Sequence, residues 1–445
     1  MLLNIGIDDT DSEVFGCTTH VAAKIVQYLD GRRGISFMDY PLLVRLNPNI
    51  PWKTRGNGAV SIRINIDDSE ASVDEVVESV SSIVRKFSDL NSPRSEPAIV
   101  FSKSFPEKGD ALHQFYLRAL RSMVPPTEAL KVAREVGATC SFLKNSKVGV
   151  VGALAAVGAV FEDYTYEILS YRIRENYGKP RRIDPHSVYL MDEASSNHTF
   201  NNVDPETKRI LITPHGRDPV LFGIRGETPE AVYNAFRLVK AEEEVECWCI
   251  FKTNQGTDAH FPETPVKINQ IKKYDSTLVE GNVTSKKVIQ GGHVIITLSN
   301  EGSKIFCAFY SPTGSLKKKA SELEPGDYVK VYGGVKEHSG ALTVNAEKME
   351  IVKLCEKTRK ASPTCPKCGR SCKNLGLRQG FVCKKCGEQV SEPQVIKVER
   401  DLKINHPYLP PERAHRHLTK PLKRYGREKN RLTETIGFIS PWHFP

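Results

Sequence analysis

The alternation of apolar and polar positions divides the chain into a front half of strands and helices and a rear part of short strands. Apolar runs at 2–7 and 41–48 predict buried strands, and the helical spacing of apolar residues over 73–87 predicts an amphipathic helix. Thr228 followed by Pro229 predicts a helix start, because a hydroxyl can cap free N–H groups and proline suits the first helical turn. This mixture is typical of α/β and α+β domains.

The rear part has a different period. From 284 to 355, short alternating stretches are separated by glycine turns and contain no long helical pattern. Such a pattern predicts a small β-barrel of OB type, a fold that often binds nucleic-acid bases on its open face. The strand–helix–strand order ending near 253 favours a ferredoxin-like unit ahead of this barrel.

Composition is that of an ordinary globular protein, with 39% hydrophobic and 26% charged residues among 445. Asp8 and Asp9 stand where the apolar part of a signal peptide would lie, and the longest apolar run, 148–161, is too short to span a bilayer. We therefore expect a cytoplasmic protein with no membrane partner and reduced cysteines.

Positive charge is concentrated near the C-terminus. The net charge is +10, and residues 356–431 hold 20 Lys and Arg against 7 Asp and Glu. A nearly neutral body with a basic end favours a polyanionic partner such as nucleic acid. A solvated tail that serves only solubility is the alternative.

Two CxxC pairs, Cys365 with Cys368 and Cys383 with Cys386, predict a structural Zn²⁺ site. Four thiolates complete a tetrahedral shell, so no position is open for catalysis. The cations that stud this module are candidate phosphate contacts. They are Lys367, Arg370, Lys373, Lys384 and Lys385.

Asp8, Asp9 and Asp11 follow the first predicted strand directly. Ligand sites of α/β sheets favour strand ends, and hard carboxylate oxygens suit Mg²⁺, which neutralises phosphates. The alternative is a turn in which the aspartates satisfy only their own backbone. The chain has neither an EF-hand spacing here nor a P-loop or protein-kinase signature.

Three further segments are candidates for contact with phosphates. Thr18 and Thr19 stand at a predicted helix N-terminus, which stabilises a phosphate, although a plain N-cap is the alternative. A glycine-rich loop lets backbone approach a ligand closely, unless it is only a hairpin turn. This loop comprises Arg55, Gly56, Asn57 and Gly58. Lys144 and Lys147 are weaker phosphate candidates, with ordinary surface lysines as the alternative.

Five segments together resemble one known family. They are IGIDDTDS at 5–12, KTRGNGAVSI at 53–62, DYTYEILSYR at 163–172, GRDPVLFGIRG at 216–226 and TNQGTDAHF at 253–261. In this order, followed by the CxxC pairs, they are similar to the archaeal tRNA(Ile) 2-agmatinylcytidine synthetases, also called agmatidine synthetases. The resemblance runs over nearly the whole chain.

The resemblance implies ATP-dependent ligation of agmatine to C2 of the wobble cytidine in the isoleucine tRNA with a CAU anticodon, so that AUA codons are read. ATP phosphorylates the C2 carbonyl oxygen, the amine of agmatine displaces phosphate, and ATP ends as AMP and phosphates. Asp8, Asp9 and Asp11 would hold Mg²⁺ on the triphosphate, and Thr18, or else Thr19, would become phosphorylated.

The family's fold implies an unusual α/β kinase-like domain, a ferredoxin-like domain, an OB fold and a zinc ribbon. We place these at 1–110, 111–255, 284–355 and 356–395, with a connector at 256–283 and a basic tail at 396–445.

The remaining candidates concern agmatine and RNA. Asp163, Tyr164 and Glu167 offer carboxylates and an aromatic wall to the guanidinium of agmatine, although tyrosines on such a strand often serve core packing. Arg416 and Arg424 in the tail are candidate tRNA contacts. Two other functions are open: a non-catalytic nucleic-acid-binding protein, and a metal-dependent phosphodiesterase.

Overall fold

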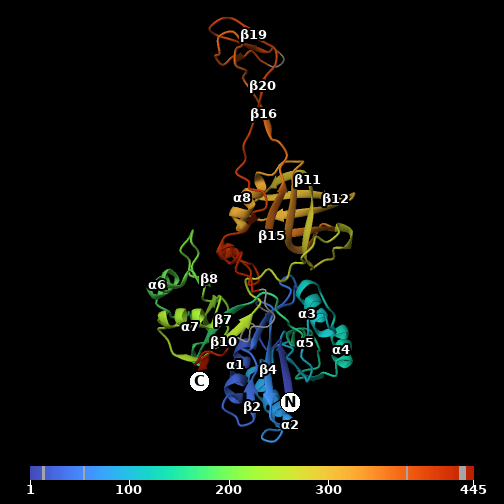
Figure 1. The fold of residues 1–445 in the computed structure, drawn as a ribbon, viewed down its shortest axis with the longest axis vertical. Coiled ribbons are helices and arrows are strands. Elements are labelled where there is room, and N and C mark those ends of the chain that lie inside the picture. Colours follow the sequence, from blue (N-terminus) through green and yellow to red (C-terminus); the bar gives the residue numbers. More distant parts are fainter. Residues whose placement is uncertain (13–15, 54–55, 377–378, 430–436, 445) are drawn as a thin grey trace.

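The computed structural model describes residues 1–12, 16–53, 56–376, 379–429 and 437–444. A body of mixed strands and helices carries both ends of the chain, the OB barrel stands beside it, and the zinc ribbon lies farthest out on a narrow stalk (Figure 1). Within the described residues, no helix is long and apolar enough to cross a membrane.

One continuous sheet runs through the whole front half. Most neighbours in it are antiparallel, but β3 (Leu42–Arg45) and β10 (Val245–Thr253) pair in parallel and join its two halves. The order is β6 (Thr139–Phe142), β5 (Ala98–Ser102), β1 (Leu2–Asp8), β4 (Gly58–Ile66), β3, β10, β7 (Thr165–Arg172), β9 (Val220–Gly226) and β8 (Thr199–Phe200). Two short strands, β2 (Ile35–Phe37) and β22 (His443–Phe444), pair with β4 and β10.

Helices cover both faces of the first half of this sheet. The apolar stripes of α1 (Thr18–Leu29) and α2 (Val73–Phe87) pack on the face formed by Leu3, Ile5 and Ile7. The other face is covered by α3 (Ala111–Arg121), α4 (Pro126–Glu135) and α5 (Val150–Val157). The second half carries α6 (Pro185–Ser195) and α7 (Pro229–Leu238), and Thr228 caps α7 as the sequence predicts.

The rear domain is a closed barrel, which confirms the predicted OB fold. Its strands are β11 (Ser276–Ile289), β12 (His293–Asn300), β13 (Ser303–Phe309), β14 (Tyr328–His338) and β15 (Ala341–Lys353), with α8 (Ser315–Ser321) between β13 and β14. Parallel pairing of β13 with β15 closes it. β11 begins at Ser276, inside the range that we assigned to the connector.

The zinc ribbon is small and stands apart. Its three short strands are β17 (Lys373–Asn374), β18 (Phe381–Val382) and β19 (Gln389–Val390). A two-stranded stalk, β16 (Thr358–Ala361) with β20 (Gln394–Lys397), carries it beyond the barrel (Figure 1). The ribbon therefore touches solvent on most sides.

After the stalk, the chain returns to the body instead of forming a solvated tail. We call residues 407–429 the return segment. It starts as β21 (Pro407–Tyr408), which pairs with β15 of the barrel, and then passes between the barrel and the front half. Beyond it, Trp442 and Phe438 pack on Tyr40 of the body.

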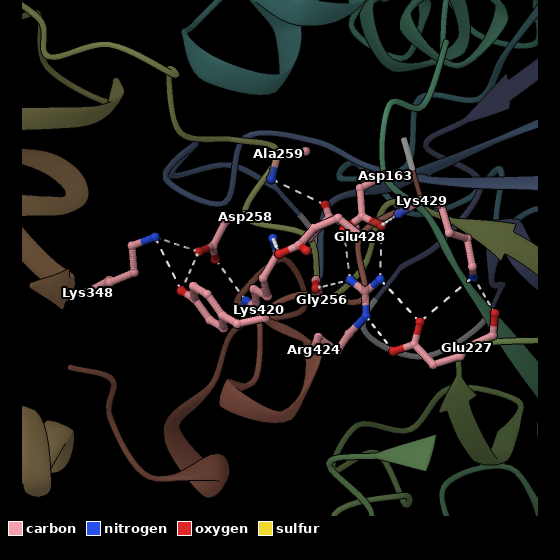
Figure 2. A network of polar contacts seen from close by, with 12 residues as sticks. Asp163, Glu227, Gly256, Asp258, Ala259, Lys348, Lys420, Arg424, Glu428 and Lys429 are labelled. Carbon is pink, nitrogen blue, oxygen red and sulfur yellow. Dashed lines mark hydrogen bonds and ion pairs between the residues drawn. The ribbon is translucent and has the colours of Figure 1, made fainter. Parts of the chain in front are cut away.

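Figure 2 shows how the return segment is fixed. The guanidinium of Arg424 lies between the carboxylates of Asp163 and Glu227, and its Nη1 also donates to the carbonyl oxygen of Gly256. Asp258 accepts from the amide of Lys420 and from the ammonium of Lys348, which belongs to β15. Return segment, barrel and front half are thus joined by one polar network.

Candidate functional site

Three aspartates leave the end of β1 at the mouth of a large cavity. Burial and repulsion from Asp9 raise the pKa of Asp8 well above its usual value. Burial and the charge of Asp11 raise the pKa of Asp9 to about 7. Asp9 also adopts a left-handed backbone (φ 60°), a conformation that aspartate tolerates better than most non-glycine residues. Such crowded carboxylates are typical of a cation site.

Two helices begin beside these carboxylates. In α5, the backbone at Gly152 lies so close to Asp8 that an added Cβ would come within 1.8 Å of its Oδ2. In α1, the N-cap position is occupied by Cys17, whose side chain makes no capping hydrogen bond. The alternative that Thr18 is simply the N-cap residue is therefore wrong. The hydroxyl of Thr18 instead accepts from Thr10, at 3.1 Å between the oxygens. The positive ends of both helices thus face the site.

The cavity has a volume of about 1410 Å³, more than a single small ligand needs. It extends from the aspartates to the return segment, and both halves of the sheet contribute to it. Its polar lining includes Asp8, Asp9, Asp11, Thr18, Arg45, Lys53, Gly56, Asn57, Gly58, Glu167, Arg225, Arg413, Arg416 and His417.

The glycine-rich loop is part of this lining. It belongs to the connection between antiparallel neighbours β3 and β4, and it also faces the cavity. Asn57 holds it with a left-handed backbone (φ 49°) and a hydrogen bond from its amide to the carbonyl oxygen of Asn47. Gly56 lies against Arg45 and His417. The predicted Arg55 lies outside the described residues.

The two predicted lysines lie away from the cavity lining. Lys144 donates to the carbonyl oxygens of Ser92 and Ser95, at 2.6 and 2.8 Å, and so holds the loop that precedes β5. Lys147 lies over the ring of Phe142. Lys144 is therefore a supporting residue of the loop behind Asp9.

The three residues predicted for agmatine do not converge. Asp163 is held by Arg424, and Tyr164 is buried in an aromatic cluster with Tyr166. Glu167 alone lines the cavity, where Arg225 donates to its Oε1 at 2.9 Å. Both carboxylates thus already have arginine partners within the chain.

The return segment supplies residues that the sequence pattern did not assign to the cavity. Arg416 lines it, donates to Asn49 at 2.8 Å and pairs with Glu347 of the barrel at 3.2 Å. His417 lines it as well, and burial together with the charges of Arg45 and Arg225 lowers its pKa well below the usual value. Arg424 is fully buried, so its side chain offers no RNA contact in this structure. The one sequence feature that could have indicated these cavity residues is the cluster RAHRH at 413–417.

The four cysteines predicted to bind zinc come together. The Sγ atoms of Cys365 and Cys386 are 3.5 Å apart, and those of Cys368 and Cys383 are 3.4 Å apart. Tetrahedral Zn²⁺ with bonds of about 2.3 Å requires sulfur separations of about 3.8 Å, so the set fits this ion closely. All four ligand atoms lie within 4.8 Å of one another.

A second group of possible ligands, His20, Glu246 and Cys247, lies beneath α1. Here Lys24 pairs with Glu246 at 2.9 Å and His20 hydrogen-bonds the same carboxylate at 3.0 Å. An ammonium in this position already neutralises the carboxylate, so the group serves as a partly buried ion pair that anchors α1 to β10.

Family models match along the chain. The TiaS TCKD domain matches residues 4–145, the TiaS FLD domain 147–260, an OB-fold nucleic acid binding domain 277–352 and the TiaS C-terminal zinc ribbon domain 362–402.

Relatives are similar over nearly their full length. The 2-agmatinylcytidine synthetase TiaS of Pyrococcus horikoshii, named for its isoleucine tRNA, is 43% identical over 95% of this chain and 97% of its own. The protein of that name from Methanocaldococcus jannaschii is 39% identical over 95% and 99%.

Solved structures agree. Apo TiaS, described as an agmatidine synthetase of an isoleucine tRNA, has a TM-score of 0.83 at 37% identity, covering 95% of this chain and 98% of that one. A complex of TiaS with isoleucine tRNA, AMPCPP and agmatine has a TM-score of 0.80 at 34% identity, with coverages of 95% and 97%.

Proposed function

Because the chain belongs to the TiaS family of tRNA(Ile) 2-agmatinylcytidine synthetases, we propose that it joins agmatine to C2 of the wobble cytidine of an isoleucine tRNA at the expense of ATP. The substrates are the CAU-anticodon isoleucine tRNA, agmatine and ATP. Because tRNA is the substrate, we expect the enzyme in the cytoplasm.

The nucleotide is held where β1, α1 and α5 meet. Asp8, Asp9 and Asp11 are the ligands proposed for Mg²⁺, and the raised pKa values of Asp8 and Asp9 reflect carboxylates that gain from a cation between them. The ion supplies charge neutralisation on the triphosphate. The N-termini of α1 and α5 add backbone N–H groups and positive dipole ends for its oxygens.

The chemistry needs a good leaving group at C2 of cytidine. An amide-like carbonyl oxygen leaves poorly, and transfer of a phosphoryl group from ATP to that oxygen makes it leave as phosphate when the amine of agmatine attacks. Thr18 lines the cavity beside the aspartates, so its hydroxyl is the proposed acceptor of the phosphoryl group in autophosphorylation.

The tRNA is held by several parts of the chain. A wobble base must leave the anticodon stack for its C2 to enter the cavity. The cavity is large enough for a nucleotide pair, and both the barrel and the ribbon extend from the same side of the body (Figure 1). The ribbon cations, Lys367, Arg370, Lys373, Lys384 and Lys385, are the proposed contacts with its phosphates.

The observation that carries this proposal is one cavity with buried carboxylates and two helix N-termini at the end of β1. The test is transfer of labelled agmatine to a transcript of the CAU-anticodon isoleucine tRNA. We expect label only when ATP and Mg²⁺ are both present, and no label in a transcript whose wobble cytidine is replaced by uridine. Absence of label in the complete mixture with folded protein would refute the proposal.

A further inference from the structure

Two arginines on the cavity wall share a single carboxylate. Arg225 in β9 donates from Nε to Oε1 of Glu167 at 2.9 Å, and Nη2 of Arg45, at the end of β3, lies 3.7 Å from Oε2. The Glu167 side chain is 2% exposed, against 13% for Arg45 and 19% for Arg225. All three line the cavity, so the arginines form its surface above a buried counter-charge.

The charges on this wall do not cancel. Guanidinium groups stay protonated in proteins, so the two arginines and the one carboxylate that they contact leave one positive charge in excess, which Asp11 offsets in part through its charge on Arg45. Among the described residues, Glu167 is the acidic partner that either arginine contacts. His417 lies beside both, hydrogen-bonded to Arg225 at 3.1 Å, and burial keeps it neutral by lowering its pKa. Arg416, which also lines the cavity, is already paired with Glu347.

Arg45 also has an unused donor. Its Nε is buried and has no hydrogen-bond partner among the described residues. The backbone of the glycine-rich loop lies against the same guanidinium: a Cβ at Gly56 or Gly58 would come within 2.7 or 3.0 Å of Nη1. Glycine at both positions therefore keeps the approach to Arg45 open.

This chemistry suits an anion and repels agmatine. The guanidinium and amine of agmatine are both cationic, and Glu167 already accepts from Arg225 and from Gln255. A phosphate, by contrast, can accept two parallel hydrogen bonds from an arginine guanidinium, and the excess positive charge stabilises it.

We propose that Arg45 and Arg225 form a phosphate subsite of the cavity and that Glu167 is its buried counter-charge rather than the agmatine carboxylate. The proposal rests on the function proposed above for its choice of ligand. A phosphate could reach this site from the tRNA backbone beside the wobble nucleotide or from ATP, and the two sources share the chemistry of the oxyanion.

The test uses Arg45→Gln and Arg225→Gln in the full-length protein. Each change leaves Glu167 with the other arginine, so neither creates an unpaired buried charge. Arg118→Gln on the outer surface of α3 is the matched control, because it removes the same charge outside the cavity. Binding of the isoleucine tRNA is measured without ATP, and binding of ATP without tRNA.

We expect each variant to lower the affinity for either tRNA or ATP by about tenfold or more, which is the loss typical of a charge-assisted contact. The control should change neither affinity. Weaker tRNA binding, together with a decrease of about one in the slope of log affinity against log salt concentration, identifies a backbone phosphate. Weaker ATP binding identifies a nucleotide phosphate. Unchanged binding of both ligands would overturn the subsite.

Glu167→Gln separates the subsite from an agmatine site. Removing the counter-charge raises the positive excess, so the affected phosphate ligand should bind more tightly and the KM for agmatine should stay the same. A rise in KM for agmatine with unchanged phosphate binding would overturn the proposal. Pyrophosphate in metal-free buffer gives a readout that does not depend on the proposed function: in a calorimetric titration it should bind the wild type but not Arg45→Gln.

Discussion

Replacing Arg424 with methionine should release the return segment from the body. The arginine donates to Asp163 twice, at 3.0 Å each, and to Glu227 at 2.7 and 3.3 Å, while its side chain is 1% exposed. Methionine fills similar space but leaves two carboxylates, 13% and 12% exposed, without their shared cation. Breaking a buried pair in this way costs about 3–5 kcal/mol.

The measurement is hydrogen exchange over the return segment, because a protein of several domains has no single free energy of unfolding. A loss of about 3–5 kcal/mol should speed exchange of its protected amides by two or more orders of magnitude, at about 1.4 kcal/mol per factor of ten. Agmatine transfer should fall as well, since this segment supplies Arg416 and His417 to the cavity.

Arg427→Met is the matched control. It lies three residues farther along, is exposed, and should change exchange by less than a factor of about three. Adding Asp163→Asn and Glu227→Gln to Arg424→Met should restore part of the protection, because neither carboxylate is then left without its shared cation and Lys429 keeps its hydrogen bonds to the carbonyl oxygens of Tyr164 and Glu227. Unchanged exchange in Arg424→Met would refute the reasoning, and so would equal loss in the control.

Asp9→Asn should lower agmatine transfer and AMP release by about a hundredfold or more through loss of a cation ligand, while tRNA binding stays unchanged; unaltered AMP release would contradict this. Thr18→Ala should abolish labelling of the protein by γ-labelled ATP, whereas Thr19→Ala keeps it, and the reverse pattern would move the acceptor to Thr19. Removing zinc with a chelator, or Cys383→Ser, should weaken tRNA binding but not ATP binding, and equal loss of both would show that the ribbon supports the whole fold. Although burial opposes it, hydrogen bonds from Thr207 and Arg413 lower the pKa of Asp204 to about 2. Because this folded-state pKa lies below the unfolded value, the stabilisation exists above about pH 4 and is lost as pH falls toward 2; the protection factors of the return-segment amides, which correct for the pH dependence of intrinsic exchange, should fall over that window, and less so in Asp204→Asn.

The sequence predicts features that depend on local spacing. The four zinc cysteines, the barrel strands and the amphipathic helix at 73–87 each follow from a short pattern, and the structure has all of them. The run of carboxylates after β1 was also visible in the sequence, although the sequence alone left open that it forms only a turn.

The rest depends on contacts between distant parts of the chain. Arg424 meets Asp163 across 261 positions, and no local pattern distinguishes a buried arginine in a basic segment from a solvated one. The same holds for Asn254 and Gln255, two polar residues just ahead of the predicted connector, which are fully buried. Asn254 donates to the carbonyl oxygen of Arg45, and Gln255 donates to Glu167, so both hold cavity residues in place.

The parallel pairing of β3 with β10 makes the two front domains inseparable as expressed fragments. A cut between 145 and 147 would leave each strand with an unpaired, largely apolar edge, and such edges template aggregation. The second fragment would also keep the buried side chains of β10 without the β3 side of the sheet that shields them. Studies of isolated pieces of this enzyme should therefore begin at the barrel, whose edges close on themselves.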